Sequence, residues 1–173
     1  SPIADDQGAN MGIFCPATDE TERIIGERQV ALLRELSART ADARTWQDAC
    51  TRAAEGLGSD PYDIPWALLY LLDADHSHAT LAAATGLPTG GSLAPIEVDL
   101  ASDCVWPLAE AAHTRRTVLI SDLAQRAGEA ALPPGPFGQA AKQAAVLPIT
   151  ASGATGKAGL LVVGLNPLRL YDE

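Results

Sequence analysis

A segment near the C-terminal end, residues 153–158 (GATGKA), has part of the pattern of a phosphate-binding loop. The full motif needs a glycine at position 151 and a serine or threonine at position 158, and the chain has Ala151 and Ala158 there. Apolar, strand-like runs flank the segment on both sides, so no helix N-terminus follows to receive a phosphate. The segment is therefore predicted to be a hairpin turn.

A second group, Asp73, Asp75, His76 and His78, places two carboxylates and two imidazoles within six residues. These side chains are suitable metal ligands. However, alternate residues around a tight turn rarely converge on one ion, and Asp-rich segments between strands are typical of solvated turns. We expect a polar turn here and predict no metal ion.

A third group, Cys104 and His113, contains a nucleophile and a base of the kind that covalent catalysis uses. No third residue that would orient the base can be identified from the sequence. A cysteine between Asp103 and Val105 is more typical of a small buried apolar residue. No pair of carboxylates lies in a setting that suggests acid–base work. No catalytic residue and no cofactor are therefore predicted.

Large aromatic side chains gather near the segments that would cover one face of a sheet. Trp66 and Tyr70 lie on or next to a predicted central strand, and Trp106 and Phe137 lie at irregular connections. Simple core packing is one explanation. The alternative is a small-molecule pocket between the sheet and its covering segments. Its expected wall is Trp66, Cys104, Trp106 and Phe137.

Composition limits the possible partners. The 173 residues carry a net charge of −10, with a pI near 4.6, and 47% are apolar. This charge disfavours nucleic acid and anionic membrane surfaces, because phosphate binding needs clustered Lys and Arg. The longest apolar run is strand-sized, so no membrane insertion is expected, and the N-terminus has no secretory signal. Three widely spaced cysteines form no disulfide or zinc pattern, which favours the cytoplasm.

A charged amphipathic helix is predicted over residues 21–39, with Asp19 or Thr21 as its N-cap. Its apolar residues Ile25, Leu32 and Leu36 follow near-heptad spacing, and Val30 and Leu33 adjoin them. An apolar stripe of this kind predicts self-association, so we expect a homodimer through Ile25, Leu32 and Leu36.

The remaining pattern predicts short strands and two further helices. A second helix follows Thr45, with the apolar stripe Trp46, Ala49, Cys50, Ala53 and Leu57. Another helix opens at Trp106-Pro107. Connections 87–103 and 123–143 are expected to be irregular. The run from Trp66 to Leu72 is apolar on both faces, which predicts a central strand that forms a hairpin with the next. Strands are predicted at 65–73, 79–85, 117–120, 144–149 and 158–165.

With these elements in order, the segments LLYLLD, WPLAEAAHTRRTVLISDL, AAVLPI and AGLLVVGL resemble a GAF domain. The resemblance implies an α+β fold with a central antiparallel sheet of about six strands and flanking helices that dimerise. The preceding segment, GIFCPATDETERIIGERQVALLRELSART, is similar to the end of a PAS domain and its signalling helix. The expected organisation is thus a PAS-like remnant at residues 1–19, a linker helix at 20–44 and a GAF domain at 45–173 that lacks the family's final helix.

The resemblance implies a sensory or regulatory domain of a bacterial signal-transduction protein of the sensor histidine kinase type. It would bind an unknown small molecule and contact adjacent signalling domains. Bilin is not supported, because Cys104 is followed by Val105 rather than histidine, and the cyclic GMP signature is absent. The alternatives are a thiol-dependent methionine sulfoxide reductase, for which Cys104 alone lies in the right region, or a dimerisation module without a ligand.

Overall fold

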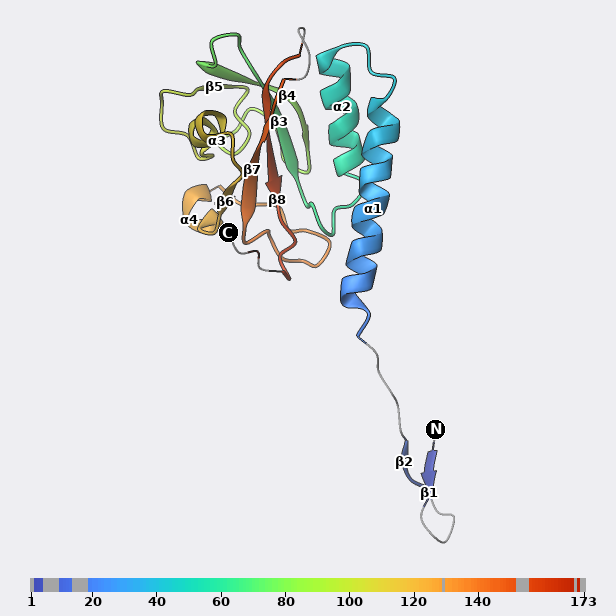
Figure 1. The fold of residues 1–173 in the computed structure, drawn as a ribbon. Helices are drawn as coiled ribbons and strands as arrows, with labels where there is room; N and C mark the ends of the chain where they lie inside the picture. The colour runs from blue at the N-terminus through green and yellow to red at the C-terminus, as the bar shows by residue number, and fades with distance from the viewer. Residues whose placement is uncertain are drawn as a thin grey trace. The chain divides into compact units, whose positions relative to one another are not determined.

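The chain divides into two units, residues 1–31 and 32–173, in a computed structural model (Figure 1). The structure describes residues 2–4, 10–13, 19–128, 130–151, 156–169 and 171. Among these residues no helix is both long and apolar enough to cross a membrane. Each unit is described separately.

The first unit begins with a two-stranded antiparallel hairpin. Strand β1 (Pro2–Ala4) pairs with β2 (Asn10–Ile13). No strand was predicted for residues 2–4. Three residues of β1 are too few to show an alternating pattern. Residues 5–9, which connect the two strands, lie outside the described residues.

Helix α1 (Thr21–Thr40) is confirmed, and its N-terminus has the expected cap, since Asp19 accepts a hydrogen bond from the Thr21 N–H at 2.9 Å. Its apolar residues are placed differently from the expected seam. Ile25 is buried, and Leu36 packs within the second unit, so these residues are not on the exposed face. Val30 and Leu33 remain exposed, at 47% and 64%.

Helix α2 (Trp46–Leu57) follows, capped as predicted by Thr45, whose Oγ1 accepts the Asp48 N–H at 3.1 Å. Cys50 and Leu57 lie on its buried face, but Trp46 does not. Trp46 is 40% exposed because it is the first helical residue and extends past the edge of the packed layer. A Cβ on Gly56 would come within 2.9 Å of Leu36 Cδ2, so α1 and α2 approach closely here.

A six-stranded, entirely antiparallel sheet forms the second unit, in the order β5-β4-β3-β8-β7-β6. The predicted fold class is confirmed, as is the hairpin of β3 with β4. Five strands were expected within a few residues of their observed bounds. The strands are β3 (Ala67–Leu72), β4 (His78–Thr85), β5 (Glu97–Asp99), β6 (Val118–Ile120), β7 (Ala144–Ile149) and β8 (Gly159–Gly164).

Both connections predicted to be irregular contain a short element. Strand β5 lies within 87–103 and pairs with the end of β4, and helix α4 (Leu123–Ala127) begins the stretch 123–143. Helix α3 (Leu108–Thr114) begins directly after Pro107. Elements of three to five residues carry too little periodicity to be recognised from sequence.

Strand β3 separates two apolar clusters, because successive side chains of a strand point to opposite faces. Leu68 and Tyr70 face the cluster on the side of α3 and α4, whereas Ala67 and Leu69 face the cluster under α2 (Figure 1). All four are buried. The prediction of a strand covered on both faces is therefore confirmed.

Two glycines make room for Trp66, which precedes β3. Gly86 has a φ of +73° and approaches so closely that a Cβ would lie 2.3 Å from the Pro65 carbonyl oxygen. At Gly164, which ends β8, a Cβ would meet the Trp66 indole at 2.5 Å. A side chain at either position is therefore sterically incompatible with this placement of Trp66.

Candidate functional site

Trp66 and Trp106, two of the four expected pocket residues, lie together in the core. Their ring centroids are 5.3 Å apart with the planes inclined at 40°, and their exposed fractions are 0% and 1%. The Trp106 Nε1–H donates to the Leu93 carbonyl at 2.8 Å, which binds the first covering connection to the aromatic pair. This region of the sheet face is filled by the protein's own side chains.

Cys104 and Phe137 lie apart from each other. Cys104 is half-buried and lines a cavity of about 210 Å³ together with Trp106. Phe137 is 39% exposed and makes an edge-to-face contact with Tyr62 at 5.3 Å between centroids. Neither Trp66 nor Phe137 lines the Cys104 cavity. The structure thus brings Trp106 together with Trp66 and with Cys104, but it does not join all four residues around one cavity.

The two described cysteines are on opposite faces of the sheet. Cys50 is buried in the cluster under α2, and burial raises the pKa of its thiol. Cys104 packs against the cluster on the α3 side, close to Tyr70. Burial, with a smaller contribution from Cys104, raises the pKa of the Tyr70 phenol, whose hydroxyl donates to the Pro95 carbonyl at 3.1 Å. A disulfide requires Cα atoms within about 7 Å, a distance that two thiols across a covered sheet do not reach. Cys15 lies outside the described residues.

The Asp73–His78 segment is a hydrogen-bonded turn between β3 and β4. Asp73 accepts from the backbone N–H groups of Ser77 and His78, at 2.9 and 3.1 Å, and from the Ser77 hydroxyl at 3.0 Å. The His78 backbone N–H is the main cause that lowers the pKa of Asp73 to about 2. Asp75 also accepts from the Ser77 hydroxyl. The carboxylates therefore order this turn, and no group of three metal-ligating side chains occurs in the described part of the chain.

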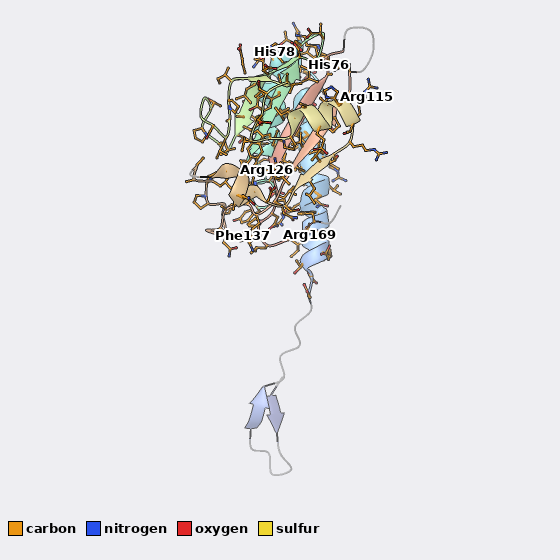
Figure 2. All side chains as sticks on the ribbon, turned by 90° about the vertical axis from the view of Figure 1, so that its left-hand side faces the viewer. His76, His78, Arg115, Arg126, Phe137 and Arg169 are labelled. Atoms are coloured by element: carbon orange, nitrogen blue, oxygen red, sulfur yellow. The ribbon has the colours of Figure 1, made fainter. Side chains whose placement is uncertain are left out.

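A cavity of about 570 Å³, which we call the end cavity, opens at this end of the sheet. It lies between the β3–β4 turn, the C-terminal end of α3 and the facing ends of β7 and β8. Its charged and polar wall contains Asp73, His76, Arg115 and Lys157, and Leu160 contributes to its apolar floor. Figure 2 shows His76 and Arg115 at the same end of the domain, with Phe137 at the other. Its volume is typical of small-molecule sites.

Sequence reasoning missed this cavity, although it named several of its residues. Arg115 was considered only as part of the segment WPLAEAAHTRRTVLISDL, and Lys157 was set aside with the incomplete phosphate-binding motif. One signal was present: Arg115 ends a helix at a position where glycine is usual. The convergence of Arg115 with Lys157 depends on β8 returning beside α3 and could not be seen from spacing alone.

Comparison with solved structures places the fold. No family model and no curated protein matches the chain. Solved structures do match. The GAF domain of a phosphoenolpyruvate-protein phosphotransferase from Acinetobacter has a TM-score of 0.57 at 15% identity, covering 84% of this chain and 82% of that one. A GAF sensor protein from Burkholderia vietnamiensis has a TM-score of 0.55 at 16% identity, covering 82% and 79%.

An enzyme is similar to the same degree. The free methionine-R-sulfoxide reductase from Neisseria meningitidis, solved with its substrate, has a TM-score of 0.56 at 19% identity and covers 93% of this chain and 84% of that one. At these identities the likeness establishes the fold and nothing more specific. The chain has a GAF-like fold, which occurs both in sensor proteins of bacteria and in this class of reductase.

Proposed function

We propose that this chain is a non-catalytic sensory or regulatory domain of a bacterial signal-transduction protein of the sensor histidine kinase type, acting in the cytoplasm. The observation that carries the proposal is the separation of Cys50 from Cys104 by the sheet. Reduction of a sulfoxide by a thiol leaves a sulfenic acid, which a second cysteine within reach of the nucleophile converts to a disulfide that thioredoxin can reduce, and Cys50 does not reach Cys104. The end cavity, in contrast, is open and of suitable size for a small ligand.

Dimerisation is the second part of the proposed role. The exposed apolar residues of α1, Val30 and Leu33, support pairing of two copies along this helix. Of the residues expected to pair, Ile25 is buried, Leu36 packs against the cluster under α2 and Leu32 is half-buried, so the proposed pairing face is centred on Val30 and Leu33. Adjacent signalling domains are the proposed partners that such a helical pair would contact.

A reductase remains the second candidate because Cys104 is half-buried and lines a small cavity with Trp106. The deciding experiment incubates the protein with free methionine-R-sulfoxide, thioredoxin, thioredoxin reductase and NADPH. We expect no NADPH oxidation above that of a Cys104→Ser variant. Turnover that Cys104→Ser abolishes, and Cys50→Ser does not, would replace the regulatory proposal with the enzymatic one.

Native mass spectrometry of the purified protein then separates a sensor from a pure dimerisation module. We expect a retained small molecule in the sensor case. A mass equal to that of the chain alone, after purification without dialysis, favours the dimerisation module.

A further inference from the structure

The backbone of the end cavity is held in an uncommon conformation at two positions, His76 and Arg115, whose side chains carry hydrogen-bond donors. Among the described residues, two that bear a side chain have positive φ: His76 at 58° and Arg115 at 55°. Both line the end cavity. Left-handed backbone is unfavourable for residues other than glycine, and such positions concentrate at functional sites.

Arg115 is the clearer of the two cases. It is the C-cap of α3, where its N–H donates to the Ala111 carbonyl at 3.0 Å. Glycine fits this left-handed cap without strain and is the residue commonly found there. The fold alone therefore favours glycine at position 115, so the arginine side chain must be explained by what it contacts. The neighbouring Arg116 can also place a positive charge near the negative C-terminal end of the helix dipole, but it lines a different cavity, next to β6.

The charges around the end cavity favour an anion, in a chain whose net charge is −10. Arg115 and Lys157 contribute two fixed positive charges, and His76 adds an imidazole that can donate a hydrogen bond. Within the described residues no carboxylate forms an ion pair with Arg115 or Lys157. The carboxylate in the wall, Asp73, already accepts hydrogen bonds from Ser77 and His78.

We infer that the end cavity binds a small metabolite through an oxyanion group, a carboxylate or a phosphate, held by Arg115 and Lys157 with His76 as a further donor. Guanidinium binds both groups through paired N–H donors, and Lys157 adds a point charge. Ile149, which is 41% exposed in the same wall, would contact an apolar part of the molecule. This inference rests on the ligand-binding role proposed above and specifies the chemistry of the ligand.

The test uses the whole chain and two probes, inorganic phosphate and succinate, titrated separately at about 0.15 M ionic strength, where exposed charges are screened beyond about 8 Å, and followed by amide chemical shifts. We expect saturable shifts at residues of the end cavity, with the tighter probe identifying the kind of oxyanion. Arg115→Gly should weaken binding of that probe about tenfold, the loss of one charge-assisted interaction. The same variant should raise Tm by about 2–4 °C, because it relieves the left-handed strain.

Two further variants separate binding from folding. Arg115→Lys keeps the charge and should retain more affinity than Arg115→Gly, although it keeps the strain. Arg116→Ala removes the same charge from the next position and should leave affinity within about twofold, since exposed charges act weakly at a distance.

Three results would overturn the inference. The first is the absence of saturable shifts with both probes, and the second is an unchanged affinity in Arg115→Gly. The third is an equal loss of affinity in Arg115→Gly and Arg116→Ala, which would indicate only nonspecific electrostatic attraction. The regulatory proposal is judged separately. An uncharged molecule retained in native mass spectrometry would leave that proposal standing while this inference fails, and reductase turnover would remove the regulatory role whatever the anion titration shows.

Discussion

Replacing Gly164 with alanine tests whether the close approach of β8 to Trp66 determines the packing of this face. An alanine Cβ would lie 2.5 Å from Cε2 and 2.6 Å from Nε1 of the indole. The indole cannot move away easily, because it is fully buried and stacked on Trp106. Overpacking of a rigid core typically costs about 1–3 kcal/mol, and the stiffer unfolded chain of the alanine variant offsets less than about 1 kcal/mol. We expect a net loss of about 1.5 kcal/mol, or about 3–6 °C in Tm.

Urea unfolding followed by far-UV circular dichroism measures this loss without relying on tryptophan emission. Gly91→Ala is the matched control, since nothing lies within 4 Å of the Cβ it would add, and its stability should equal or slightly exceed that of the parent. A double-mutant cycle with Trp66→Leu adds a sharper criterion: the two changes should be less than additive, because the smaller side chain leaves room for the new methyl group. A loss below about 0.5 kcal/mol for Gly164→Ala, or strict additivity with Trp66→Leu, would refute the steric argument.

Three further predictions concern other parts of the fold. Asn166→Ala removes the 2.9 Å hydrogen bond to the buried Asp63 carboxylate and should cost about 2 kcal/mol in urea unfolding; a change under about 0.5 kcal/mol would contradict this. Asp73→Asn should lower Tm at neutral pH. The folded-state pKa of Asp73 is depressed to about 2, so the carboxylate's contribution to the free energy of unfolding is fully present above pH 3.8. This contribution is lost as the pH falls towards 2, and the Tm values of parent and variant should therefore converge there. A Tm difference that persists at pH 2 would disprove the assignment. Leu33→Glu should shift the protein from dimer to monomer in sedimentation, because Leu33 is 64% exposed on α1; a parent chain that sediments as a monomer would remove the dimer proposal.

The long elements could be predicted from the sequence because their periodicity is strong. Strand β3 is apolar at every position, and α2 follows a capping threonine with an apolar stripe, so both were expected within two residues of their bounds. Strand β5 and helix α4, with three and five residues, were missed because elements this short show no recognisable periodicity and are determined by contacts with the rest of the fold. Local pattern is thus informative only when an element is long enough to repeat it.

The candidate site was less predictable than the fold. Aromatic residues at Trp66 and Trp106 suggested a pocket wall, but the same size and apolarity suit a core, and the structure buries them. The end cavity is formed by four chain segments, and His76, Arg115 and Lys157 come from three of them that are distant in sequence. No spacing rule relates these segments, and only the sheet order places them together.

The position of β3 between β4 and β8 has a consequence for synthesis of the chain. One edge of β3 pairs with β4 as soon as the next hairpin strand has been made, but the other edge pairs with β8, which follows about 90 residues later. At ordinary translation rates this edge of β3 stays unpaired for on the order of 5–20 s. The segment ALLYLL has no charge, proline or glycine, which is the composition of aggregation-prone stretches. The nascent chain is therefore most exposed to misassociation before β8 emerges, and slow translation or limited chaperone capacity should lower its yield.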